Sequence, residues 1–194
     1  MLILLLSCAI VIPDNGDDSY PAFGGGDTLD ILTWNLQRFP KNSSTVDYMV
    51  DAVAAMRPDI IALQEIDSEF SLMQLANRLP EYEYVLGPGG GNWGLAYLYN
   101  YELVQLDTPV YEIFTNSSRP FPRPPYVMEM RWNGESIIVI NNHFKAGGNG
   151  VIELNDPWDE ETRRVEAVEL LYNYMETHFA DEKIKKRFKS LLCS

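Results

Sequence analysis

Cysteine and histidine are scarce in this chain of 194 residues, which has two of each. Cys8 and Cys193 lie at opposite ends of the sequence. This placement excludes a disulfide framework and a cysteine-rich zinc site. If the protein binds a catalytic metal ion, its ligands should therefore be oxygen atoms.

Positive charge is also in short supply, because 15 Lys and Arg residues face 28 Asp and Glu residues. The resulting net charge of −13 disfavours broad adhesion to nucleic acid or anionic lipid, unless cations or a local basic patch intervene. An acidic metal site remains compatible with it. The length and the 46% hydrophobic content predict one globular domain with a substantial core.

The first apolar run, residues 1–12, is too short to cross a bilayer as a helix and is interpreted as an export signal. Within it, the residues up to Cys8 resemble the lipobox of bacterial lipoproteins, so lipidation of Cys8 is expected. The alternative is a plain cleaved signal with an incidental cysteine. Residues 13–27 are expected to form a flexible linker, and the product to be an envelope lipoprotein or extracellular.

Hydrophobic periodicity beyond the linker predicts strands that alternate with helices. A strand begins at Leu29 and ends at Asn35, a helix starts at Ser44 with Asp47 completing a capping box, and residues 59–63 form a buried strand. The helix should bury Val46, Met49, Val50 and Val53.

Further strands are expected at Tyr82–Leu86, Leu95–Tyr99, Tyr126–Trp132 and Ser136–Asn141. A last helix is predicted with Asp156 as its N-cap and Pro157 as its first residue. Its expected apolar stripe is Val165, Val168, Leu171, Tyr172 and Met175. The order predicts a layered α/β or α+β domain.

Three polar motifs follow predicted strands: Asn35, then Glu65, then His143 with Lys145. Strand ends at one sheet edge can converge on a single site. Taken singly, Asn35 is also typical of a turn, Glu65 of a solvated strand end, and His143 of a structural histidine. Their order along the chain favours a joint site.

The order Trp34-Asn35, then Ile60 to Glu65, then Asn141-x-His143-x-Lys145 resembles the endonuclease/exonuclease/phosphatase superfamily. The similarity extends from Leu29 to about Phe179, which places a partial domain of this kind at residues 28–180. The resemblance implies a four-layer α/β sandwich, in which two packed sheets carry helices on their outer faces. It also implies a phosphoric ester hydrolase.

The resemblance implies that Glu65 binds the catalytic Mg²⁺ or Mn²⁺ and that His143 contacts the scissile phosphate. It also places Asn35 in the metal site, beside the metal and the phosphate, where a neutral amide orients without adding negative charge. Magnesium prefers hard oxygen ligands and retains several waters, which suits this set. Arg123, within Arg-Pro-Pro, and Lys145 are candidates for phosphate contact. The alternative for both is a solvated loop cation. His178 is assigned to structure.

The resemblance stops after the last predicted helix, where relatives continue into Gly-Asp-x-Asn and later Ser-Asp-His. Neither motif occurs here, and residues 181–194 form a basic tail instead. A truncated or frame-shifted reading frame is the preferred interpretation, and a natural tail for a partner is the alternative. The absent residues are those that the resemblance assigns to activating water, so the chain as written is expected to be inactive.

The function expected from these features is divalent-metal-dependent hydrolysis of phosphodiester bonds by an exported endonuclease acting on nucleic acid. One alternative is a phosphatase or a sphingomyelinase-like esterase of the same superfamily. Another is a non-catalytic envelope lipoprotein that contacts the membrane only through its lipid anchor. Loops set specificity in such folds, so the motifs alone do not identify the substrate.

Overall fold

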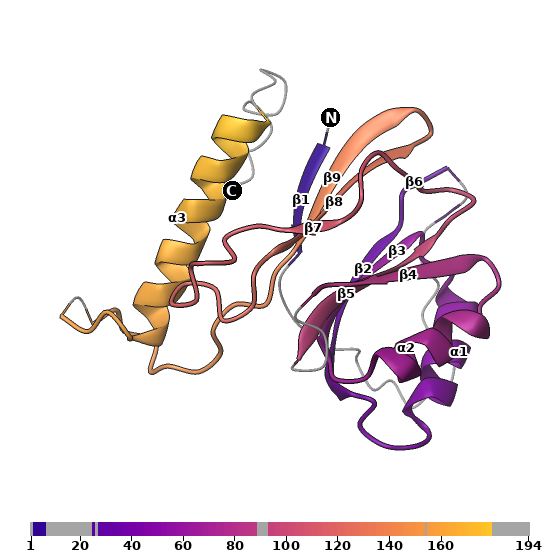
Figure 1. Ribbon diagram of the computed structural model, residues 1–194, viewed down its shortest axis with the longest axis horizontal. Coiled ribbons are helices and arrows are strands. Elements are labelled where there is room, and N and C mark those ends of the chain that lie inside the picture. Colours follow the sequence, from indigo (N-terminus) through magenta and orange to yellow (C-terminus); the bar gives the residue numbers. More distant parts are fainter. Residues whose placement is uncertain (1, 7–24, 26, 89–92, 154, 180–194) are drawn as a thin grey trace.

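A computed structural model describes residues 2–6, 25, 27–88, 93–153 and 155–179. These residues form two sheets and three helices in the order β1(Leu2–Leu6), β2(Ile31–Phe39), α1(Thr45–Met56), β3(Ile60–Ile66), α2(Glu69–Asn77), β4(Tyr82–Leu86), β5(Gly94–Asn100), β6(Gln105–Leu106), β7(Tyr111–Glu112), β8(Tyr126–Trp132), β9(Glu135–Asn141) and α3(Glu160–His178). In Figure 1, α1 and α2 lie outside one sheet and α3 lies beside the other.

One sheet has the strand order β2-β3-β5-β4, in which β2 and β3 are parallel and the remaining pairs are antiparallel. Its central strand β3 is the continuous apolar run of the sequence, and Ile60 to Leu63 are fully buried. A strand covered on both faces has no polar side, which explains why its side chains do not alternate. The predicted strand-helix-strand order is confirmed as β2-α1-β3, and the two strands pair in parallel.

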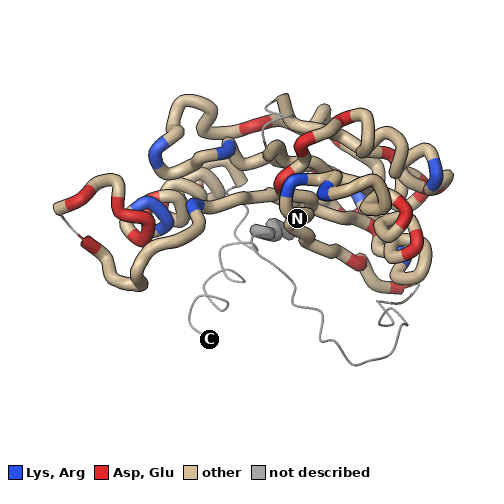
Figure 2. The backbone as a smooth tube through the Cα atoms, turned by 90° about the horizontal axis from the view of Figure 1, so that it is seen from below, with Lys and Arg blue, Asp and Glu red and all other residues tan. Residues whose placement is uncertain are grey.

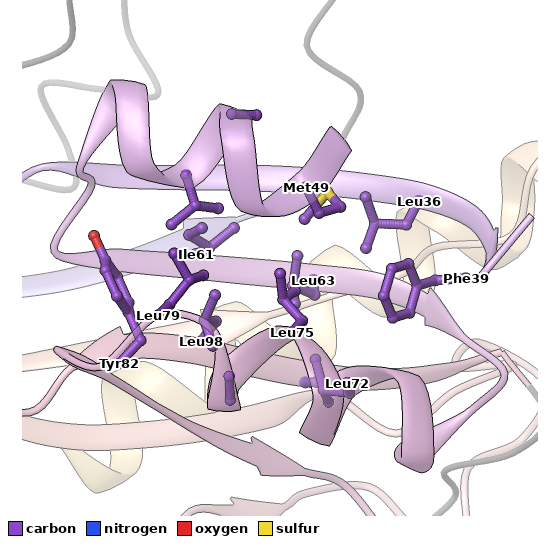
Figure 3. Packing of buried hydrophobic residues seen from close by; sticks show 14 of the residues in the cluster. Leu36, Phe39, Met49, Ile61, Leu63, Leu72, Leu75, Leu79, Tyr82 and Leu98 are labelled. Carbon is purple, nitrogen blue, oxygen red and sulfur yellow. The ribbon is translucent and has the colours of Figure 1, made fainter. Parts of the chain in front are cut away.

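Helices α1 and α2 cover the outer face of this sheet (Figure 3). Met49 and Val53 of α1 are buried, and Val46 and Val50 are partly buried against the same cluster, as the periodicity predicted. Leu72 and Leu75 of α2 complete the layer. This shorter helix was not predicted, and its N-cap Ser68 accepts a hydrogen bond from the backbone N–H of Ser71.

The second sheet has the order β1-β9-β8-β6, with β7 also pairing with β8. β1 pairs with β9 in parallel, so residues 2–6 of the predicted export signal form a strand at the edge of this sheet. Export remains a prediction. Cys8 and residues 181–194 lie outside the described residues, as does most of the predicted linker.

The inner faces of the two sheets pack together through apolar side chains that include Ile60, Tyr97 and Met128. Within this core, the hydroxyl of Tyr97 lies 2.8 Å from the carbonyl oxygen of Tyr126 and 2.9 Å from that of Val139, and it accepts the N–H of Asn141. Tyr97 belongs to the first sheet, whereas its partners belong to β8 and β9. A single buried hydroxyl therefore fixes the position of one sheet relative to the other.

Helix α3 covers the outer face of the second sheet through Ala167, Leu171 and Met175, so the molecule has the four layers expected of the predicted α/β sandwich. The predicted helix start was wrong, because the N-cap is Asp159 and the first helical residue is Glu160. Asp156 instead accepts the backbone N–H of Trp158 in the preceding turn. Among the described residues, no helix has the length and apolarity needed to cross a membrane.

The predicted stripe of α3 was wrong for three of its five residues. Val165, Val168 and Tyr172 are 45%, 47% and 42% exposed. Successive buried positions four residues apart place Ala167, rather than Val168, against the sheet. The helix thus carries two adjacent apolar stripes, and the second sheet covers one of them.

Two local predictions near the first helix also need correction. Ser44 is the N-cap of α1, but its side chain makes no capping hydrogen bond, so the capping box is absent. β2 does not end at Asn35 and continues to Phe39. The strand predicted at residues 59–63 is β3, which continues to Ile66. The four later strands are confirmed, with ends that differ by at most one residue.

We expect Tyr97→Phe to lower the free energy of unfolding by about 1–3 kcal/mol, because the N–H of Asn141 then stays buried without a partner. Urea denaturation measures the loss. The control is Tyr99→Phe, whose hydroxyl donates to Glu83 at the exposed edge, where water can replace it. Equal losses in the two variants would contradict a special role for the hydroxyl between the sheets.

Candidate active site

Glu65 lies at an irregularity near the end of β3. The register of β3 shifts against β5 between Gln64 and Ile66, and Glu65 has a positive φ of 61°. A bulge of this kind inserts one residue that does not pair and redirects its side chain. Non-glycine residues adopt this conformation at a cost and are concentrated at functional sites. The bulge explains how a carboxylate leaves an otherwise buried strand.

Asn35 of the neighbouring strand β2 positions this carboxylate. Its amide group donates a hydrogen bond of 3.0 Å to Oε1 of Glu65, and its carbonyl oxygen accepts the backbone N–H of Gln37. The two residues predicted to act together are therefore in direct contact. In this arrangement Asn35 orients the carboxylate of Glu65 with its NH₂ group, and metal binding by either residue remains a prediction.

His143 follows β9 and reaches the same carboxylate from the second sheet. Its Nε2 lies 3.6 Å from Oε1 of Glu65, and both side chains are largely buried. Burial lowers the pKa of His143 below 6.5, the nearby Glu65 raises it, and Arg123 lowers it further. Burial thus favours the neutral form of the imidazole. Its buried Nδ1 has no hydrogen-bond partner among the described residues.

A network of buried polar side chains supports the candidate active site, and it was not predicted from the sequence. Gln64 donates to Oδ1 of Asn141 at 2.7 Å and to the hydroxyl of Thr33 at 3.1 Å. Asn141 in turn donates to the carbonyl oxygens of Leu63 and Ala96 on the opposite sheet. The sequence contains a sign of this network, because Gln64 and Asn141 are amide residues at the ends of apolar strands, where buried polar side chains are uncommon and need partners.

Of the two cations predicted to contact phosphate, Arg123 is the one near this site, because its charge lowers the pKa of His143. Its guanidinium also lies 5.4 Å from the ring centroid of Trp93. Arg38 lies at the same distance from that ring and forms an ion pair with Asp67. Neither Trp93 nor Arg38 was predicted from the sequence to belong to the site.

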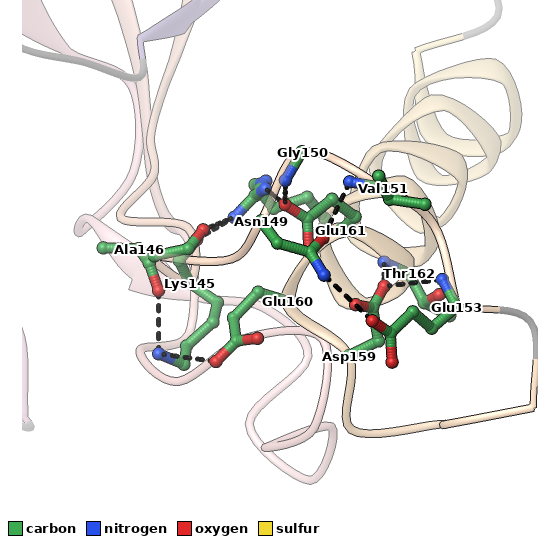
Figure 4. Close-up of polar contacts among 12 residues, drawn as sticks. Lys145, Ala146, Asn149, Gly150, Val151, Glu153, Asp159, Glu160, Glu161 and Thr162 are labelled. Carbon is green, nitrogen blue, oxygen red and sulfur yellow. Dashed lines mark hydrogen bonds and ion pairs between the residues drawn. The ribbon is translucent and has the colours of Figure 1, made fainter.

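Lys145 has a partner outside this cluster. Its Nζ lies 3.6 Å from Glu160 at the start of α3 and donates to the carbonyl oxygen of Ala146 (Figure 4). Arg164 donates to the carbonyl oxygens of Lys145 and Gly147, and it forms an ion pair with Glu161. The segment after His143 is thereby anchored to α3. Contact between Lys145 and phosphate remains a prediction.

Three carboxylates, those of Asp159, Glu160 and Glu161, lie close together at the start of α3. Each has a structural partner. Asp159 caps the N–H of Thr162, Glu160 faces Lys145, and Glu161 accepts the N–H of Gly150 at 2.6 Å (Figure 4). These contacts account for the acidic cluster without a metal ion. His178 packs against Tyr174 of the same helix, which agrees with its assignment to structure.

The sequence profile described as the Endonuclease/Exonuclease/phosphatase family matches residues 32–180. The chain therefore belongs to this family, as its motifs predicted. Members of the family are phosphoesterase hydrolases, among them nucleases and phosphatases, and they generally depend on divalent metal ions. A comparison with curated protein sequences gave no match.

Solved structures share the fold at low sequence identity. Humanized D. rerio TDP2 superimposes with a TM-score of 0.60 at 16% identity, over 77% of this chain and 57% of that one. D. rerio TDP2 complexed with a single-strand DNA product gives 0.59 at 14% identity, over 77% and 55%. The human Nocturnin catalytic domain with bound sulfate gives 0.54 at 17%, over 76% and 59%. The chain thus spans somewhat more than half the length of these structures.

We expect Arg123→Gln to raise the pKa of His143 and Glu65→Gln to lower it, because each substitution removes one of the charges that act on the imidazole. Histidine NMR signals followed against pH measure both changes, with His178→Gln used for assignment. A pKa unchanged in Arg123→Gln would contradict the proximity of the two side chains.

The pKa of His143 also predicts how stability depends on pH. Because its pKa in the folded state lies below 6.5, the unfolded chain binds the proton more readily. The free energy of unfolding should therefore fall as pH drops from 6.5 through the folded-state pKa.

We expect Gly148→Ala to loosen the segment after His143 more than Gly147→Ala does. Both glycines have positive φ, but a methyl group on Gly148 would collide with the carboxylate of Glu161, whereas one on Gly147 meets no atom. The shared backbone strain costs about 1–2 kcal/mol, and the collision should add at least about 1 kcal/mol. Urea denaturation and hydrogen exchange at the N–H of Gly150 measure the difference, and equal effects would refute it.

Proposed function

We propose that this protein hydrolyses phosphodiester bonds with the help of a divalent metal ion held by Glu65. The observation that carries this proposal is the meeting of Asn35, Glu65 and His143, which come from both sheets and are joined by contacts of 3.0 and 3.6 Å. Their order and residue types are those that the family resemblance assigns to the metal and phosphate site. Membership of the family supports the same chemistry.

The donor set fits Mg²⁺ or Mn²⁺. Glu65 supplies a carboxylate whose position is fixed by a hydrogen bond from Asn35. Magnesium is often bound by one or two carboxylates, with waters and substrate oxygens completing the octahedron. When bound, such an ion stabilises negative charge on phosphoryl oxygens and lowers the pKa of coordinated water.

His143 and Arg123 contribute two different interactions with phosphate. The neutral imidazole can donate one N–H to a nonbridging oxygen without requiring a counter-charge. Arg123 is permanently charged and can donate two hydrogen bonds to one phosphate. Both groups lie in a partly buried site, where such interactions stabilise developing charge more strongly than in water.

The proposed substrate is nucleic acid. D. rerio TDP2, which shares the fold, has been crystallised with a single-strand DNA product, and this supports the proposal by analogy only. The arginines beside the site provide a local basic patch, which a chain with a net charge of −13 needs in order to bind a polyanion. Export and lipidation at Cys8 are proposed from the sequence alone.

We expect Glu65→Gln to weaken Mn²⁺ binding by at least tenfold and to reduce metal-dependent hydrolysis by at least about 100-fold, because the charged ligand is lost. Electron paramagnetic resonance of added Mn²⁺ measures binding. Release of nitrophenolate from bis(p-nitrophenyl) phosphate measures hydrolysis, which the sequence predicts only for a form that also carries the Gly-Asp-x-Asn and Ser-Asp-His motifs.

The matched control is Glu69→Gln, which removes the same charge from an exposed position at the start of α2. This variant should bind Mn²⁺ as the unaltered protein does. If Glu65→Gln keeps the original Mn²⁺ affinity and turnover, Glu65 is not the metal ligand. If every form, including longer ones, fails to hydrolyse the ester with Mg²⁺ or Mn²⁺, the proposed function is wrong.

A further inference from the structure

Three residues that the sequence motifs do not connect meet beside the candidate active site. The guanidinium carbons of Arg38 and Arg123 each lie 5.4 Å from the ring centroid of Trp93, so they are no more than twice that distance apart. Arg38 is on β2, Trp93 precedes β5, and Arg123 precedes β8. We call these three residues the Arg-Trp-Arg platform.

The platform is continuous with the metal and phosphate site. Asp67, two residues after the proposed metal ligand Glu65, forms the ion pair with Arg38 and accepts the backbone N–H of Trp93. Arg38 is itself three residues after Asn35, which donates a hydrogen bond to Glu65. When one phosphate is bound at Glu65, a neighbouring phosphate of the same strand would therefore lie within reach of the platform.

The backbone of β2 is distorted at the residue that joins the platform. Gln37 and Arg38 both have positive φ, of 50° and 70°, where the pairing of β2 with β3 shifts register between Asn35 and Phe39. Two consecutive non-glycine residues in this region are costly, and such strain is concentrated at functional sites. The distortion directs Arg38 toward Trp93 instead of along a regular strand.

The two arginines retain capacity to bind an anion. Arg123 forms no ion pair with a carboxylate among the described residues. The side chain of Arg38 is 66% exposed, and its single ion pair there, with Asp67, is long at 3.4 Å. Asp67 also accepts the backbone N–H of Trp93 at 2.9 Å, so the same carboxylate fixes the ring and the guanidinium. Trp93 itself is 37% exposed.

We propose that the Arg-Trp-Arg platform binds a nucleic acid strand, with Arg38 contacting the phosphate next to the scissile one and Trp93 positioning both arginines. This inference rests on the proposed function and adds to it the residues that hold the substrate strand beyond the scissile phosphate. An ester with a single phosphate, such as a phospholipid head group, has nothing to place at Arg38. Acidic residues are spread over the rest of the chain (Figure 2) and would repel a polyanion. A local pair of cations is therefore needed to hold a nucleic acid strand at this place.

The test is the salt dependence of binding to a fluorescein-labelled thymidine octamer, measured by anisotropy with Mg²⁺ present and with the octamer checked for cleavage. Arg38→Gln should weaken binding at low salt by about tenfold, the effect of losing one charge-assisted hydrogen bond. It should also make the slope of log K against log salt shallower by roughly 0.7, as expected for one lost phosphate contact on a single strand.

The matched control is Arg131→Gln, because Arg131 lies on β8 outside the platform, is similarly exposed and pairs with Asp107. Its slope should equal that of the unaltered protein. Equal slopes in the Arg38→Gln, Arg131→Gln and unaltered proteins, equal changes in the two variants, or no binding of the octamer at low salt would each overturn the proposal.

The positioning role of Trp93 has its own readout. Trp93→Phe keeps an aromatic face and should retain most of the affinity, whereas in Trp93→Ala the further change Arg38→Gln should have little effect on the slope. A full, additive effect of Arg38→Gln in the Trp93→Ala background would show that the ring does not position Arg38. Circular dichroism confirms that each variant is folded.

The outcome for the platform is independent of that for the proposed function. Metal binding and hydrolysis of a single-phosphate ester test Glu65. An unchanged salt slope in Arg38→Gln together with Glu65-dependent hydrolysis would reject the nucleic acid strand and retain the phosphodiesterase. The expected slope change without any hydrolysis would retain the strand and reject the enzyme.

Discussion

The arrangement of the two sheets depends on a few buried hydrogen bonds between them. The hydroxyl of Tyr97 and the amide of Asn141 each satisfy backbone groups of the opposite sheet. Apolar packing brings sheets together but does not fix how far one slides along the other, whereas buried polar groups must find their partners at one position. These bonds therefore select one alignment of the sheets from many that would bury the same apolar area.

The candidate active site exists only in that alignment. Glu65 and Asn35 are carried by one sheet and His143 by the other, and the residue two positions before His143 is the Asn141 that joins the sheets. The segment beyond His143 is held in turn by the start of α3. Two independent supports thus limit the movement of the imidazole relative to the carboxylate.

The sequence predicted the layers and the joint site because these follow from hydrophobic periodicity and from polar residues after buried strands. It could not predict the side of α3 that packs, since Val168 and Ala167 are both apolar and only the position of the sheet decides between them. The same limit applies to Trp93 and Arg38. Their proximity depends on a change of register in β2 and joins two residues that are 55 positions apart in the sequence. No local sequence pattern predicts such a contact.

The left-handed backbone at Gln37, Arg38 and Glu65 also constrains how this protein can evolve. Glycine, asparagine and aspartate tolerate such a conformation, whereas a β-branched residue would strain it severely. Substitutions at these positions are consequently limited to a small set of amino acids, several of which lack the length or the charge of the present side chains. A single substitution can therefore keep this backbone and remove the functional side chain, and the reverse substitution can restore it.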